Sequence, residues 1–383
     1  MGKKYSQLSV FVAACAGMAF FGVTMLSLGP ILGPLNATVA GANALPSTLS
    51  IGIIIGTLLF GPIVDKFGYK WLTILSSIFA LAGVQGLANF NTIGWLHASI
   101  CMLGIGGGIL NGLTNALVSD IYEDDKRGGK LGLLGAFYCV GALLWTLLNV
   151  FISDFRIPLN AISIVMALFI VFFFFISFPK AKPSEGGSSV SKTLGLLKYP
   201  ALFLFAFVLF FQSGFEGVSG DFTISYLVQT TQVENTVATL AMTWFTVGMF
   251  IGRILLGKIM GKLKELGTLY LYLSLALLGV IGFTLGGANM VIVYLAMALI
   301  GFGVGATFPV VLNFVGSAFR EMSGTAFSIA LFVALCGQTI LKKVSGVAFD
   351  NGNYMLFPVI LISALVIIMI LAPIAVKASK KIK

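Results

Sequence analysis

Residues 61–70 of the chain read Gly61-Pro-Ile-Val-Asp65-Lys66-Phe-Gly68-Tyr69-Lys70. This short charged segment separates two apolar runs, at residues 46–64 and 70–90. A run of about 20 apolar residues is long enough to cross the hydrocarbon core of a bilayer as a helix. The segment therefore predicts a short loop that joins two membrane-spanning helices.

The rest of the chain repeats this arrangement. Of its 383 residues, 58% are hydrophobic and 9% are charged, whereas about a quarter of the residues of a soluble domain are charged. The apolar runs, separated by polar breaks, lie near residues 7–35, 46–64, 70–90, 95–121, 131–152, 157–178, 199–230, 236–256, 267–287, 290–318, 323–348 and 353–377. They predict an all-α integral membrane protein with 12 transmembrane helices.

The chain also divides into two similar halves. The longest polar gap, residues 179–198, is rich in Pro, Gly, Ser and Lys and indicates a linker on the cytoplasmic side. The segments that begin at Gly56 and Gly252 resemble each other, and so do those that contain Gly104 and Gly301, at nearly the same separation. We expect a duplicated six-helix unit, with an N-terminal bundle at 1–178 and a C-terminal bundle at 199–383, the two related by pseudo-symmetry.

The basic residues indicate the orientation of the spans. If both termini are cytoplasmic, 19 of the 23 Lys and Arg residues fall in inside segments, as the positive-inside rule requires. We therefore expect a multi-pass protein of the plasma membrane, in a bacterium the inner membrane, whose first span is retained. The net charge of +10 follows from these loops, so no nucleic-acid partner is predicted.

Neither a metal site nor a disulfide framework is predicted. The four cysteines stand alone inside apolar runs, without a CxxC pair, and the chain contains no phosphate-binding loop or hydrolase motif. They are Cys15, Cys101, Cys139 and Cys336. We expect a protein that is not an enzyme and needs no cofactor.

The charged segment at 61–70 resembles the G-x-x-x-D-[RK]-x-G-[RY]-[RK] signature of the major facilitator superfamily. The resemblance implies a secondary transporter in which this loop acts as a conformational latch rather than a substrate site. The residues assigned to this latch are Gly61, Asp65, Lys66, Gly68 and Lys70. In the second half Gly261 stands at the acidic position, so we expect a weaker latch there.

Three further stretches look like the fucose-galactose-glucose:proton symporter family: residues 115–120, 135–143 and 214–219. This resemblance implies a sugar-class substrate that moves with protons. The chain departs from the family at Asn111 and Asn115, which replace a fourth-span acid, and at Lys342, which replaces a proline of the eleventh span. Ile100 replaces the arginine typical of drug:proton antiporters, which disfavours drug export.

Ionisable residues inside apolar runs are costly and therefore candidates for function. Glu216, near the middle of its span, is the predicted proton carrier, and Asp221 is a second proton-coupling candidate. The alternative for Glu216 is a structural hydrogen bond between helices. Lys342 is predicted to bind substrate; the alternative is that it extends to the lipid headgroups. Arg253 and Asp120 are expected to be structural.

Neutral polar and aromatic residues complete the predicted substrate site. Amides bind hydroxyl groups, and aromatic rings stack on sugars, although each aromatic can also serve as packing or as an interfacial anchor. The candidates are Asn111, Asn115, Gln212, Asn313, Gln338, Tyr138, Trp145, Tyr226 and Trp244.

The sequence thus favours proton-coupled uptake of a sugar or sugar derivative by alternating access, by a monomer whose partners are a small-molecule substrate, protons and membrane lipid. Symport of an organic anion such as a sugar acid is the alternative that Lys342 favours. A drug efflux antiporter and a non-transporting membrane receptor remain as less favoured classes.

Overall fold

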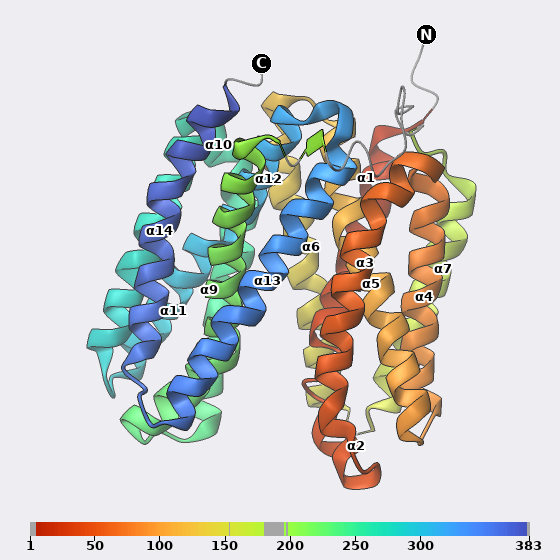
Figure 1. Cartoon of the computed structure of the whole chain (residues 1–383). Helices are drawn as coiled ribbons and strands as arrows, with labels where there is room; N and C mark the ends of the chain where they lie inside the picture. The colour runs from red at the N-terminus through yellow and green to blue at the C-terminus, as the bar shows by residue number, and fades with distance from the viewer. Residues whose placement is uncertain (1–4, 153, 180–194, 197, 381–383) are drawn as a thin grey trace. The chain divides into compact units, whose positions relative to one another are not determined.

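The computed structural model describes residues 5–152, 154–179, 195–196 and 198–380. The regular structure of these residues is helical throughout (Figure 1). Eleven helical segments among the described residues are long and apolar enough to cross a membrane. The predicted all-α membrane fold is confirmed. Most of the predicted linker, residues 180–194 and 197, lies outside the described residues.

Six long helices form the first half of the chain. They are α1 (Gln7–Leu26), α3 (Leu45–Phe67), α4 (Tyr69–Asn89), α5 (Ile93–Ile121), α6 (Asp124–Phe151) and α7 (Arg156–Phe175). A short helix, α2 (Leu32–Thr38), and a 3₁₀ turn, η1 (Ala42–Ala44), connect α1 to α3.

The second half contains α9 (Pro200–Thr231), α10 (Asn235–Gly286), α11 (Met290–Gly305), α12 (Thr307–Ala318), η2 (Arg320–Met322), α13 (Ser323–Asp350) and α14 (Leu356–Ser379). The 52 residues of α10 would extend for about 78 Å, far more than one bilayer crossing of about 30 Å. Lys264 interrupts α10 with non-helical angles, φ 58° and ψ 178°. Helices α11 and α12 together form one candidate span, Met290–Ala318. Because α10 covers two of the twelve predicted spans, the eleven candidate spans of the described residues correspond to all twelve.

The chain forms two compact units that do not coincide fully with its two halves. Unit 1 comprises Met1–Ile121, Phe137–Thr193 and Glu321–Ser328, and unit 2 comprises Tyr122–Ala136, Leu194–Arg320 and Ile329–Lys383. The first turns of α6 thus pack in unit 2, and the first turns of α13 pack in unit 1. The division into bundles at 1–178 and 199–383 stays a prediction.

The repeated glycines allow close helix packing in both units. A Cβ on Gly56 of α3 would clash with the carbonyl oxygen of Ile105 in α5, and a Cβ on Gly252 of α10 would clash with that of Phe302 in α11. Small residues let membrane helices approach backbone to backbone. The two contacts occupy equivalent places in the repeat, so they support a duplicated unit.

Candidate functional site

The segment 61–70 contains almost no loop. Helix α3 ends at Phe67 and α4 begins at Tyr69, so Gly68 alone makes the turn, with φ 81°. Residues with a side chain rarely adopt this backbone conformation, which glycine reaches without steric cost. Lys70 Nζ donates to the carbonyl oxygen of Phe174, 2.8 Å away, in the last turn of α7. Lys70 thereby anchors a helix end, where the helix dipole favours a cation.

The structure describes the other members of the predicted latch to different extents. Gly61 faces the first turns of α13: a Cβ there would lie 2.9 Å from the carbonyl oxygen of Gly324. Lys66 is exposed, and its Nζ lies 5.1 Å from the centre of the Phe67 ring. The side chain of Asp65 lies outside the described residues. The role of this segment as a latch stays a proposal.

Two hydroxyl groups bind Asp120 at the end of α5. Tyr69 Oη donates to Asp120 Oδ2 at 2.6 Å, and Ser323 Oγ donates to Asp120 Oδ1 at 2.8 Å. Nearby in unit 1, Ser328 Oγ donates to the carbonyl oxygen of Thr57 at 2.6 Å. The first turns of α13 are therefore held against α3 and α5 by hydrogen bonds. The sequence did not predict these hydrogen bonds. Tyr69 lies in the recognised segment but had no role assigned to it, and the serine hydroxyl groups of α13 carry no distinctive pattern.

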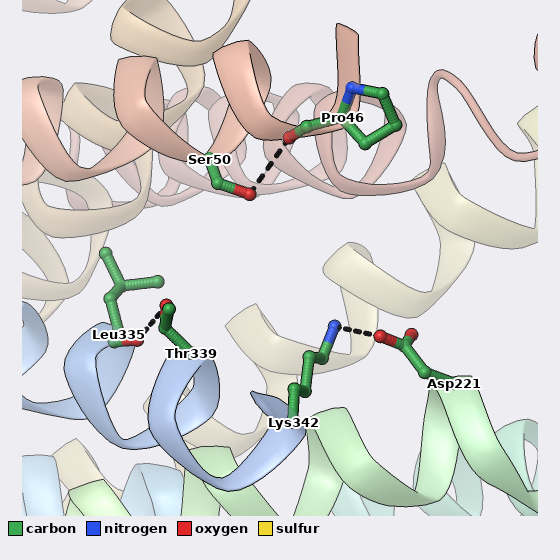
Figure 2. Close-up of polar contacts among 6 residues, drawn as sticks. All are labelled: Pro46, Ser50, Asp221, Leu335, Thr339 and Lys342. Carbon is green, nitrogen blue, oxygen red and sulfur yellow. Dashed lines mark hydrogen bonds and ion pairs between the residues drawn. The ribbon is translucent and has the colours of Figure 1, made fainter. Parts of the chain in front are cut away.

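In unit 2 the most prominent polar contact is an ion pair between α13 and α9. Lys342 Nζ lies 2.7 Å from Asp221 Oδ2, and the two side chains are 31% and 53% exposed (Figure 2). Within α13, Thr339 bonds back to the carbonyl oxygen of Leu335, 2.9 Å away, in the preceding turn. The structure therefore gives Lys342 a carboxylate partner.

Glycines of α9 provide the space that Lys342 occupies. A Cβ on Gly217 would lie 2.6 Å from Gln338 Cγ and 2.6 Å from Lys342 Cε. One turn earlier, a Cβ on Gly214 would clash with the side chain of Leu341. The aliphatic part of Lys342 thus crosses α9 at Gly217, and its ammonium group reaches Asp221 one turn further along.

Glu216 lies beside Gly217 in the middle of α9 and is partly buried. Two cations act electrostatically on its carboxyl group, Arg253 and Lys342. Arg253 is itself buried, and its Nη1 donates to the carbonyl oxygen of Gly135 at 2.7 Å. We call Glu216, Asp221, Arg253 and Lys342 the charge cluster. It contains two acids and two cations.

Two buried amides add hydrogen-bond acceptors to unit 2. Gln212, one turn before Glu216, donates through Nε2 to the carbonyl oxygen of Val304 at 3.2 Å. Its Oε1 and the Oδ1 of Asn313 are buried and have no hydrogen-bond partner among the described residues. Buried acceptors normally find a partner, so both can accept from a bound molecule or water.

Unit 1 places its candidates differently. Asn111 and Asn115 are buried one turn apart on α5, and Asn115 Nδ2 donates to the carbonyl oxygen of Asn111 at 2.8 Å. Tyr138 is partly buried, and its ring centre lies 5.7 Å from that of Phe21. Trp145 is fully buried and donates its indole N–H to the carbonyl oxygen of Leu26 at 2.8 Å. The indole N–H of Trp145 is therefore already bound within unit 1, and its predicted contact with substrate stays a prediction.

The remaining aromatic candidates lie on α9 and α10. Tyr226 is buried, with ring centres of Phe283 and Phe357 at 5.4 Å and 5.1 Å. It packs in an aromatic core, and its predicted contact with substrate stays a prediction. Trp244 is 46% exposed on α10. The structure thus brings Gln338, Lys342 and Asp221 together, with Gln212 one turn before Glu216.

The family is now established. The model of the Major Facilitator Superfamily matches residues 10–341, which is most of the chain, and the protein belongs to this superfamily. Its fold is that of a multi-pass membrane transporter. It resembles solved structures of this class over at least 95% of its length. A crystal structure of the fucose:proton symporter FucP of E. coli superposes with a TM-score of 0.82 at 18% identity. The superposition covers 97% of this chain and 99% of FucP.

Curated relatives are more distant in sequence. The Glucose/mannose transporter GlcP of Bacillus subtilis (strain 168) is 23% identical over 363 residues, 89% of this chain and 88% of GlcP. The Protein TsgA homolog of Buchnera aphidicola subsp. Schizaphis graminum is 22% identical over 197 residues, 50% of this chain. The match covers 51% of that relative, so the chain spans about half its length.

Proposed function

We propose that the protein is a secondary active transporter that takes up a sugar or sugar derivative with protons by alternating access. The observation that carries this proposal is the position of Glu216, an acid in the middle of a membrane helix that is acted on by the charges of Arg253 and Lys342. An ionisable group at this depth is costly and marks a pathway for ions or substrate.

Two similar proteins support the proposed substrate and coupling. GlcP is described as a glucose and mannose transporter, and its similarity covers 89% of this chain. FucP, with the same fold, is described as a fucose:proton symporter. Buried amides suited to hydroxyl groups, Gln212 and Asn313, lie in unit 2 together with the charge cluster.

Glu216 is the proposed proton carrier because its charged and neutral forms differ in the free energy needed to place them in the membrane. A bare carboxylate is expensive in a closed apolar path, whereas a protonated one is neutral. Protonation of Glu216 would therefore permit the loaded carrier to reorient. Asp221, five residues further along α9 and 53% exposed, is the second proposed coupling residue.

The other substrate contacts are proposed from the sequence. The residues proposed are Asn111, Asn115, Tyr138, Trp145, Gln212, Tyr226, Trp244, Asn313, Gln338 and Lys342. The segment with Gly61, Asp65, Lys66, Gly68 and Lys70 would control reorientation rather than bind. We also propose a monomer with cytoplasmic termini in the plasma membrane, surrounded by lipid.

Symport of an organic anion is the second candidate function, and the short Lys342–Asp221 pair favours it. A cation held in an accessible position is a binding group for carboxylates. Drug efflux and a receptor without transport have no specific observation in their favour.

Uptake of radiolabelled compounds into proteoliposomes tests the proposed function. The panel comprises neutral hexoses, amino sugars and uronates, each with and without an inward proton gradient. We expect at least one compound to accumulate above equilibrium only when the gradient is present. Absence of uptake of all classes, with protein verified as folded and inserted, would contradict a sugar transporter.

A further inference from the structure

The ion pair between Lys342 and Asp221 is short, but the protein does not enclose it. The two atoms are 2.7 Å apart, yet the side chains are 31% and 53% exposed. Where its exposed side meets water, such an ion pair contributes little to stability. Another carboxylate can therefore replace Asp221 on Lys342 without a large loss.

The position of the ammonium group is nevertheless well defined. The stem of Lys342 packs against Gly217, and Gln338, one turn earlier on α13, packs against the same glycine. A molecule whose carboxylate binds Lys342 would meet the amide of Gln338 next to it. This combination fits a compound that carries both a carboxylate and hydroxyl groups.

The formal charges of the charge cluster balance in the empty protein; outside the cluster, Lys343 adds an exposed cation next to Lys342 on α13. The charge cluster contains Glu216 and Asp221 against Arg253 and Lys342. Helices α10, α12 and α14 pack against α9. Helix α12 contains no charged residue, α14 contributes only Lys377 in its last turn, and α10 contributes Lys258, Lys262, Lys264 and Glu265 besides Arg253. A bound monocarboxylate adds one negative charge to the cluster, and one proton restores neutrality.

We infer that the substrate is a sugar monocarboxylate, a uronate or an aldonate, whose carboxylate replaces Asp221 on Lys342. This inference rests on the proposed function and names its substrate class. Asp221 is the resident counter-ion that neutralises Lys342 while the carrier is empty.

The exchange forms and breaks only ion pairs and one O–H bond. The substrate carboxylate forms an ion pair with Lys342, the Lys342–Asp221 pair breaks, and one proton from the medium binds to the carboxylate of Glu216. On the other side of the membrane the substrate and the proton leave, and Asp221 returns to Lys342. One proton and one monoanion thus move together.

Binding of tritiated galacturonate and of tritiated galactose to the purified full-length protein tests the inference. Lys342→Gln should weaken galacturonate binding by about ten- to hundredfold, the usual scale for a charge-assisted contact. Asp221→Asn should strengthen it several-fold, because the competing carboxylate is gone. In the double variant the gain from Asp221→Asn should vanish, because it depends on Lys342. Galactose, which has no carboxylate, should bind the wild type far more weakly than galacturonate.

Two control variants separate the role of Lys342 in carboxylate binding from a loss of structure, and a competing ligand tests the need for hydroxyl groups. Lys343→Gln removes the adjacent cation, which is exposed, and should leave galacturonate binding as in the wild type. Lys342→Arg retains the charge and should retain most of the binding. Lactate, a carboxylate without the ring hydroxyl groups, should compete weakly.

The outcomes distinguish a failure of the inferred substrate class from a failure of the proposed function. Equal galacturonate affinity in wild type and Lys342→Gln overturns the inference, and so does a gain in Asp221→Asn that persists without Lys342. If neutral hexoses accumulate under a proton gradient while uronates and aldonates do not, the inference fails and the proposed function stands. If neither class is transported, both fail.

Discussion

Tyr69, the ninth residue of the 61–70 segment, donates its hydroxyl group to Asp120 Oδ2 at a distance of 2.6 Å. This bond joins the first residue of α4 to the end of α5, and Ser323 of α13 binds the other carboxylate oxygen. Part of the recognised loop motif therefore stabilises unit 1 through Asp120, which itself lies outside the motif.

Replacing Tyr69 by Phe should lower thermal stability and leave ligand binding intact. A hydrogen bond to a charged group contributes about 1.5–3 kcal/mol, and the variant leaves one oxygen of Asp120 without its donor. Unfolding in detergent, followed by the fluorescence of a thiol-reactive dye, measures the change. Tyr199→Phe, which keeps its ring beside Phe319, is the matched control, and a melting temperature equal to that of the control would refute the prediction.

Gly217→Ala should weaken uronate binding while the protein stays folded. The added methyl group would lie 2.6 Å from Lys342 Cε and from Gln338 Cγ, so both side chains must move. Alanine is otherwise the better helix former by about 1 kcal/mol, which offsets part of the cost. We expect a several-fold rise in Kd, measured by equilibrium binding.

Gly220→Ala is the control for that variant. It lies on the same helix and has no neighbouring atom within 4 Å of its added Cβ, so it has the same effect on helix propensity without the collision. Equal loss of binding in both variants would mean that a change in α9 itself, and not the displacement of Lys342, is responsible.

The apolar runs were sufficient to predict the class of fold, because a bilayer imposes a length of about 20 residues on each span. They did not predict that α10 continues through the polar residues between its two spans, with Lys264 as the break. Hydropathy reports where a segment is apolar, whereas a change of direction depends on the backbone angles of one residue.

The site was predicted less completely, for a related reason. Glu216 and Lys342 stand out in the sequence because charges are rare in apolar runs, but the pairing of Lys342 with Asp221 joins residues on different helices. The sequence also did not predict that the indole N–H of Trp145 binds the carbonyl oxygen of Leu26 in another helix. Such contacts depend on tertiary packing, which hydropathy and motif spacing do not report.

Uronate accumulation should respond to a pH gradient and hardly at all to membrane potential. One proton and one monoanion together carry no net charge, so a potassium diffusion potential has nothing to act on. Transport of a neutral hexose with one proton would move a full charge, and 100 mV would then change accumulation by about fiftyfold. Vesicles loaded with potassium and treated with valinomycin give both measurements, and a potential-driven uptake of uronate would exclude one-to-one coupling.

Proton coupling through Glu216 is tested most directly by the transport cycle of the Glu216→Gln variant in tight proteoliposomes. A glutamine resembles the protonated acid permanently, so the loaded carrier can reorient but cannot release a proton. If Glu216 carries the proton, this variant should retain counterflow exchange of labelled substrate and lose accumulation driven by a pH gradient. Normal gradient-driven accumulation by Glu216→Gln would contradict it and would assign the coupling proton to Asp221 or to no residue at all.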